Sequence, residues 1–359
     1  MTKPRAVSLV AILLVGAVGC APETEPTDED SAVSEAELGA DDDLQSFGTY
    51  DATDDELAKA TPSTTAANEL TLYAIPAPKL TGLSWKRPGG LARRTLVGKA
   101  LGLSRSIGHA GVHVRCGATA TEPAGHFLGS VTDTDDTFRQ MVLKEKAGLG
   151  VLLRTVPGKI EPEADLQKTI DERTENGRMS FIRFQISAET CQGLLAYERE
   201  VARLDVAKEY GFVRPLYKEG AGCSAFSMAF LELANLDEAR FRREWGFDVR
   251  IPMKLIGGKD NPTNKVSALE LFFTFRPWAR EDEPHRRLIG WDPTLMYTSI
   301  RTMAKDELRN GNAHVEKRGR ALGLVLDRRN VQPRTQLSKR TFWAGEPGAP
   351  RNYWGFGDP

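Results

Sequence analysis

One cysteine stands in the sequence context that a nucleophile needs. Cys223 follows Gly220, Ala221 and Gly222 and begins the apolar run CSAFSMAFLELANL, which predicts a helix. A thiol in the first turn of a helix lies near the positive end of the helix dipole, which favours the thiolate. The glycines would let a carbonyl group approach the sulfur closely. The same pattern also fits a small cysteine that is merely packed at a helix start.

Histidine is the usual base for such a thiol, and the segment SIGHAGVHVRC contains two histidines. Its alternation predicts a strand with His109 and His113 on one face. Four residues of strand span roughly 13 Å, so the two imidazoles could hardly bind one metal ion. A strand-borne His109 beside a helix-borne Cys223 is instead the arrangement of a thiol hydrolase. We expect His113 to be structural, and we predict no metal or cofactor site.

Two short motifs resemble those of a known superfamily. GHAGVHV resembles the histidine strand of NlpC-type cell-wall peptidases, and GAGCSAFSMAFLELA resembles their cysteine helix. The histidine comes before the cysteine here, which is similar to the circularly permuted papain-like branch that includes lecithin:retinol acyltransferase-like proteins. The resemblance implies that Cys223 is the nucleophile and His109 its base. It also implies a permuted papain-like core, in which an antiparallel sheet packs on the cysteine helix.

A third polar residue that orients the histidine is also implied by the resemblance, normally at the end of the next strand. A hairpin that turns near Thr121 would place His109 opposite a position close to Asp133. We therefore expect Asp133 in this role, with Thr132 as the neighbouring alternative. His126 fits less well, because it would lie near the far end of the hairpin.

The N-terminus has the features of an export signal that ends in a cysteine. Lys3 and Arg5 precede an uncharged stretch over residues 6–19, which is too short for a membrane-spanning helix. The following AVGC resembles the lipobox of bacterial lipoproteins, in which Cys20 is acylated, although Ala17 stands where leucine is usual. An ordinary secretory signal is the alternative. Both predict export, and the lipobox implies a lipid anchor in the bacterial cell envelope.

The cysteine count bears on the nucleophile as well. If Cys20 is acylated, three cysteines remain in an oxidising compartment, and an odd count leaves one outside any intramolecular disulfide. Cys116 ends the histidine strand, and Cys191 lies in the first turn of a predicted helix. These two are the candidates for a disulfide, which would leave Cys223 as a thiol.

The net charge of -1 conceals two segments of opposite sign. Residues 21–60 carry 14 acidic residues and one lysine, whereas residues 1–20 carry two basic residues, so residues 61–359 carry a net charge of +10. Because residues 21–68 are also poor in large apolar side chains, we expect a disordered acidic tether there. Export argues against nucleic-acid binding. The basic body is compatible with anionic envelope polymers or lipid headgroups.

The pattern of helix and strand candidates over residues 69–359 predicts one α+β domain with a C-terminal extension from about residue 237. The chain of 359 residues is 40% hydrophobic, which suffices for a core. Ser187 is expected to cap a long helix over 188–210. The strand candidates are 69–78, 106–116, 126–132, 150–161, 179–187, 248–256 and 268–275.

Two functions are compatible with these features. The first is an exported cysteine hydrolase or acyltransferase that attacks an amide or ester carbonyl, with peptidoglycan peptides as the leading substrate class and lipid acyl groups next. The second is a non-catalytic envelope lipoprotein whose basic body binds a polymer or a partner. The relative placement of Cys223 and His109 distinguishes them.

Overall fold

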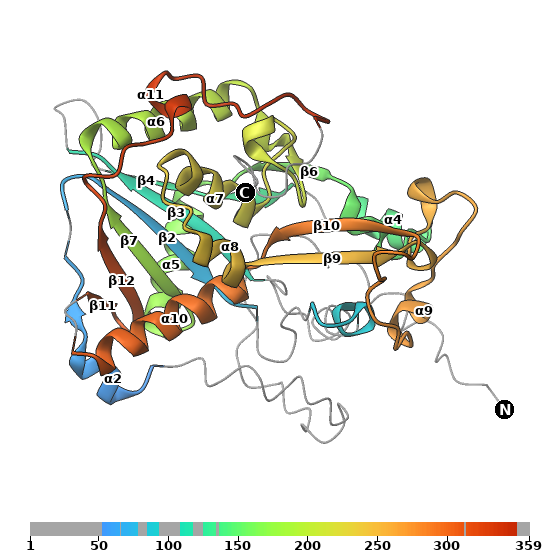
Figure 1. The fold of residues 1–359 in the computed structure, drawn as a ribbon, viewed down its shortest axis with the longest axis horizontal. Helices are drawn as coiled ribbons and strands as arrows, with labels where there is room; N and C mark the ends of the chain where they lie inside the picture. Colours follow the sequence, from blue (N-terminus) through green and yellow to red (C-terminus); the bar gives the residue numbers. More distant parts are fainter. Residues whose placement is uncertain are drawn as a thin grey trace.

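The computed structural model describes residues 52–64, 66–77, 85–92, 108–117, 125–133, 136–311 and 314–349. The expected signal peptide and Cys20 lie outside these residues. The described chain mixes helices and strands around a large sheet (Figure 1), which confirms the expected α+β class. Within the described ranges, no helix is both long and apolar enough to span a membrane.

The large sheet has the strand order β1-β11-β12-β7-β2-β3-β4. Its strands are β1 (Thr61–Pro62), β2 (Glu69–Ile75), β3 (His109–Arg115), β4 (His126–Leu128), β7 (Ser180–Gln185), β11 (Val315–Arg318) and β12 (Ala321–Asp327). β2 runs antiparallel to β3 and β7, but the β12–β7 and β1–β11 pairs are parallel. The sheet is therefore mixed and not antiparallel as expected, because β11 and β12 enter it from the C-terminal part of the chain.

Two strands from the part of the chain beyond residue 237, β11 and β12, belong to this sheet. β12 pairs with β7 over six residues, from Leu322 opposite Ser180 to Asp327 opposite Gln185. Helix α10 (Pro293–Arg309) then packs against β2, β7 and β12 (Figure 1). The described residues after 237 are thus not an extension from a finished domain, because they supply two strands next to β7.

Helices bury both faces of the large sheet. One face carries α6 (Ala188–Arg203), α7 (Cys223–Leu233), α8 (Ala239–Trp245) and α10, and α5 (Glu163–Glu175) covers the other. On the first face Leu72 and Phe184 are fully buried, as are Tyr73 and Phe181 on the second. The alternation of these neighbours along β2 and β7 is what directs them to opposite cores.

Two smaller sheets lie outside the large one. One has the order β5-β6-β8, with β5 (Ser130–Thr132), β6 (Val156–Ile160) and β8 (Glu209–Tyr210). The other is the antiparallel pair β9 (Gly246–Pro252) and β10 (His285–Trp291). With α4 (Asp136–Leu143), η3 (Leu149–Leu153) and α9 (Ala268–Phe272), this pair forms a second lobe that has its own apolar core (Figure 1).

Local sequence signals account for two helix boundaries. Ser187 caps α6 as expected, because its hydroxyl accepts a hydrogen bond from the Thr190 amide. The helix ends at Arg203 and not near 210, since Asp205 adopts a left-handed conformation with φ of 50°. Residues 268–275 were expected to be a strand, but α9 forms there because Ser267 caps the helix through the Glu270 amide.

The acidic segment is ordered where it meets the body. Helix α2 (Asp54–Lys59) begins at a capping box between Thr53 and Glu56. Glu56 lies 3.1 Å from Lys305 and 3.4 Å from Arg301, both on α10. The expectation of disorder up to residue 68 is therefore wrong for residues 52–64, because basic groups of the body compensate the acidic ones.

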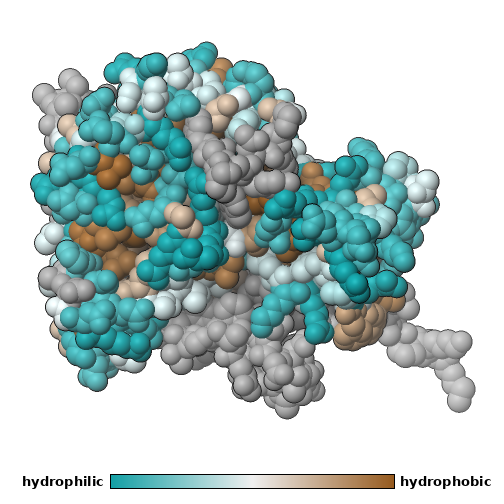
Figure 2. Space-filling model, viewed as in Figure 1, coloured by the Kyte–Doolittle hydropathy of each residue, from teal (hydrophilic) through white to brown (hydrophobic). Residues whose placement is uncertain are grey.

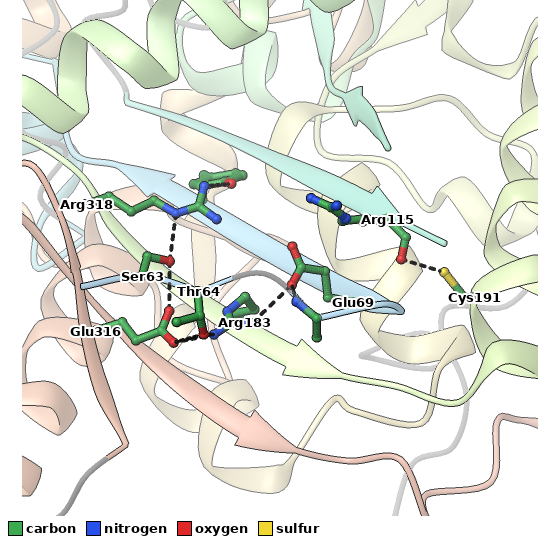
Figure 3. Close-up of polar contacts among 10 residues, drawn as sticks. Ser63, Thr64, Glu69, Arg115, Arg183, Cys191, Glu316 and Arg318 are labelled. Carbon is green, nitrogen blue, oxygen red and sulfur yellow. Dashed lines mark hydrogen bonds and ion pairs between the residues drawn. The ribbon is translucent and has the colours of Figure 1, made fainter. Parts of the chain in front are cut away.

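A buried ion network ties this segment to the sheet (Figure 3). The Arg183 guanidinium, only 1% exposed, lies between the carboxylates of Glu69 and Glu316, with 3.1 Å to Glu69. Ser63 and Thr64 donate hydrogen bonds from their hydroxyls to Glu316. The network joins β7, β2 and β11 to the residues that follow β1.

A disulfide joins Cys116, just after β3, to Cys191 in α6, with 5.7 Å between their Cα atoms. The sulfur of Cys191 lies 2.9 Å from the Arg115 carbonyl oxygen (Figure 3). The bridge fixes the far end of the histidine strand to the helix above it. Cys223 is not part of a disulfide.

Candidate active site

Cys223 is the first residue of α7, as the sequence predicted. Its side chain is 5% exposed, and Gly222 is the N-cap residue. A Cβ atom on Gly222 would lie 2.2 Å from the carbonyl oxygen of Gly211, so only glycine lets the two backbones meet. Ser227 donates a hydrogen bond to the Cys223 carbonyl oxygen at 2.9 Å. The helix start that carries the thiol is therefore tightly held.

His109 is the first residue of β3 and is fully buried. The preceding Gly108 has φ of 80°, and a Cβ atom there would lie 2.7 Å from the Ile75 carbonyl oxygen. The imidazole Nε2 lies 2.7 Å from Oε2 of Glu161, and both side chains are 0% exposed. An enclosed imidazole is thus paired with an enclosed carboxylate, which is how buried ionisable groups are usually accommodated.

Glu161 reaches this position because β5 and β6 pair. Its amide, directly after β6, donates a hydrogen bond to the Gly129 carbonyl oxygen at 3.0 Å. A Cβ atom on Gly129 would lie 2.7 Å from Oε2 of Glu161. Glycine at 129 therefore leaves the space that the carboxylate occupies beside His109.

The Cys223 side chain packs against Val131 of β5. Val131 lies opposite Lys159 of β6, and Glu161 is two residues further along. Side chains two residues apart in a strand share a face, so Val131 and Glu161 point to the same side. Such diagonal neighbours lie roughly 7–8 Å apart. Val131, which contacts Cys223, and Glu161, which binds His109, therefore point to the same side of the β5–β6 ribbon. Alternation along β3 places His109, opposite Ile75, on the side of the large sheet that α5 covers.

The other expected partners of His109 lie elsewhere. Asp133 has its carboxylate 3.0 Å from the Lys159 ammonium, and it is half exposed. Thr132 is buried, but alternation along β5 turns it to the face opposite Val131. His126 pairs with Val114, towards the far end of the hairpin.

A two-residue shift in register explains why Asp133 was preferred from the sequence. The pairs Val112–Leu128 and Val114–His126 place residue 131, not 133, level with His109. The chain also leaves β3 after Leu128 to pair with β6 instead. The carboxylate that binds His109 therefore comes from the strand after the hairpin, at Glu161.

His113 has a structural environment. Its ring stacks on Phe127 with 4.3 Å between ring centroids. Burial, with smaller effects of Arg318 and Arg115, lowers the pKa of His113 to about 4. Over the described ranges, no group of three or more His, Cys, Asp or Glu side chains could hold a metal ion.

Comparison with known proteins adds no family. The chain has no significant match to a protein-family model, a curated protein or a solved structure.

Proposed function

We propose that this chain is a cysteine hydrolase or acyltransferase, in which Cys223 is the nucleophile, His109 the general base and Glu161 the residue that positions His109. The observation that carries the proposal is the enclosed 2.7 Å His109–Glu161 pair. The β5–β6 ribbon links it to the thiol, because Cys223 packs against Val131 of β5 and Glu161 directly follows β6. A nucleophile, a base and a group that orients the base are the three parts of a thiol hydrolase site.

The contact between His109 and Glu161 determines which imidazole nitrogen is left to act on the thiol. Because Nε2 of His109 faces Glu161, Nδ1 is the nitrogen that exchanges a proton with the Cys223 thiol. The thiolate attacks the substrate carbonyl carbon, and the first amides of α7 stabilise the oxyanion. His109 then protonates the leaving amine or alcohol, so that a thioester on Cys223 remains.

The second half returns the enzyme to its starting state. Neutral His109 removes a proton from water or from an acceptor hydroxyl or amine, whose heteroatom attacks the thioester carbonyl. The Cys223 thiolate leaves and takes back the proton. Throughout the cycle the Glu161 carboxylate stabilises the imidazolium and keeps its ring orientation.

A permuted papain-like core is part of the proposal. The histidine strand precedes the cysteine helix in the chain, and α7 packs against β3. In this chain, such a core would contain a mixed sheet, because the C-terminal strands β11 and β12 lie next to β7.

The expected export signal over residues 1–19 and the lipobox-like AVGC support a lipid-anchored protein of the bacterial envelope. Peptidoglycan peptides and lipid acyl groups are the amide and ester substrates of that compartment. Of these two classes, we propose peptidoglycan peptides first.

One observation favours the non-catalytic alternative. Cys223 is 5% exposed, and His109 and Glu161 are enclosed, as in a structural polar cluster. In that case the protein would be an envelope lipoprotein that binds an anionic polymer or partner through its basic body.

Trapping of the acyl-enzyme separates the two functions. The full chain is incubated with p-nitrophenyl acetate, quenched in acid and digested, and the adduct is located by mass spectrometry. We expect an acetyl group on Cys223 that is absent in His109→Ala and retained in His113→Gln, which changes the other histidine of the same strand. An unmodified Cys223, or equal modification in His109→Ala, would reject the enzyme.

A further inference from the structure

Three large apolar side chains are exposed together at the end of the second lobe. Leu269, Phe273 and Phe275 are 51%, 60% and 69% exposed, and we call them the apolar tip. Figure 2 shows a light-brown patch at the lower right end of this lobe, bordered by hydrophilic residues. A cluster of this kind on a projecting end marks a binding surface more often than scattered single residues do.

The apolar tip is firmly supported from within. Leu271 of α9 is 3% exposed and belongs to the core of the second lobe, and Phe272 packs against the same core. Gly89 packs so closely that a Cβ atom on it would lie 1.9 Å from the Thr274 carbonyl oxygen. The Trp278 indole donates a hydrogen bond to the Trp85 carbonyl oxygen at 2.5 Å. The backbone that carries the tip is therefore held by these contacts with the rest of the lobe.

The two segments that carry the apolar tip are basic, and the residues that follow them, 280–283, add three carboxylates and one cation. The two segments that form this end, 85–92 and 265–278, contain four cations and one carboxylate, which gives a net charge of +3. The cations are Lys86, Arg87, Lys265 and Arg276, all exposed, and the carboxylate is Glu270. Basic side chains around exposed aromatic ones suit a surface of anionic lipid headgroups over an apolar layer.

We propose that the apolar tip inserts into an anionic lipid bilayer. The tip lies at the end of the lobe with its side chains exposed, which suits a deformable surface such as a bilayer. A second copy of the chain fits less well, because three side chains are far too few for the roughly 1,200 Å² that a stable interface buries. The proposal is independent of catalysis. If the chain is anchored through Cys20, the tip adds a second contact that orients the body on the membrane.

Hydrogen exchange with vesicles tests the proposal on the full chain carrying Cys20→Ser, which cannot be acylated. Vesicles of equal parts phosphatidylcholine and phosphatidylglycerol should slow amide exchange in residues 265–278. Pure phosphatidylcholine should do so less, because it lacks the anionic charge. Combined substitution Leu269→Ser, Phe273→Ser and Phe275→Ser should abolish the protection and weaken vesicle binding by this end at least about tenfold.

The matched control is Leu204→Ser, which removes the remaining large exposed apolar side chain of the described residues, on the main body at 37% exposure. It should leave the protection of 265–278 unchanged. The single variant Phe273→Ser, which should keep the wild-type melting temperature, is the control for misfolding of the triple variant. Unprotected 265–278 on vesicles that bind the chain would overturn the proposal. Protection that grows with protein concentration without vesicles would assign the tip to a second copy and overturn it too.

Discussion

Nε2 of His109 lies 2.7 Å from Oε2 of Glu161, and neither side chain has exposed surface. Two ionisable groups withdrawn from water cost several kcal/mol each unless they satisfy one another. Gly129 is what allows them to meet, because its missing side chain leaves room for the carboxylate. Three separate segments, at residues 109, 129 and 161, thus combine to hold the imidazole in one orientation.

Glu161→Gln tests the positioning role. The amide keeps the volume and one hydrogen bond but no longer stabilises the imidazolium. We expect kcat to fall at least about tenfold, with a smaller change in KM and a displaced pH–rate profile. The measurement is ester hydrolysis across a pH series, with the melting temperature recorded alongside.

Asp133→Asn is the control for that substitution. The Asp133 carboxylate is half exposed and pairs with Lys159, and such surface pairs contribute about 0–1 kcal/mol. Activity and pH profile should stay at wild-type levels. If Asp133→Asn impaired activity as strongly as Glu161→Gln, the assignment of Glu161 as the residue that positions His109 would be wrong.

Cys223→Ala should abolish turnover without unfolding the chain. The change removes one sulfur atom at a helix start and leaves Gly222 and the Ser227 hydrogen bond in place. We expect a loss of stability of at most about 2 kcal/mol, measured by urea unfolding. Residual turnover at wild-type rate would show that another residue performs the reaction.

The disulfide between Cys116 and Cys191 should contribute to stability. It closes a loop with a sequence separation of 75, and bridges of this kind typically contribute about 2–4 kcal/mol. The double variant Cys116→Ala and Cys191→Ala should lose this amount in urea unfolding, and a reductant should then have no further effect. If the reductant lowers the free energy of unfolding equally in the wild type and in the double variant, the Cys116–Cys191 disulfide is not the source of that stability.

His113 should make the protein less stable in mild acid. Its folded pKa of about 4 lies below the ordinary value of 6.5, so the unfolded chain binds more protons between these values. The free energy of unfolding should therefore fall as pH drops from about 6.5 to about 4, by about 1–3 kcal/mol. His113→Gln should flatten this part of the pH dependence, as measured by urea unfolding at several pH values. An unchanged slope would contradict the assignment.

Arg183→Met should be among the most destabilising substitutions in the sheet. It leaves the carboxylates of Glu69 and Glu316 buried without their cation, which typically costs about 3–5 kcal/mol. Arg203→Met is the matched control, because its pair with Glu200 is on the surface. Equal effects of the two variants would show that burial of the network does not matter.

Short-range patterns predicted the elements that carry the site. The alternation around His109, the apolar run after Cys223 and the hydroxyl of Ser187 correspond to β3, α7 and the cap of α6. The cysteine count likewise singled out Cys116 and Cys191. Each of these features depends on neighbouring residues or on simple counting, which a single sequence contains.

Contacts between residues that are distant in sequence could not be predicted from such local patterns. Glu161 reaches His109 only through the register of β5 with β6, and no local signal sets it apart from Asp133. The acidic residues around Glu56 have the composition of a tether, but α10, about 245 residues further along the chain, supplies their basic partners. In each case the decisive contact crosses a large distance in sequence.

The most direct test of the central claim is the alkylation rate of Cys223 by iodoacetamide in the native full chain, followed by peptide mass spectrometry from pH 5 to pH 9. If His109 activates the thiol, Cys223 should react faster than an ordinary thiol at neutral pH. His109→Ala should slow it at least about tenfold and move the dependence towards the ordinary cysteine pKa near 8.5. A Cys223 that reacts only when urea unfolds the chain, or equally with and without His109, would contradict the account.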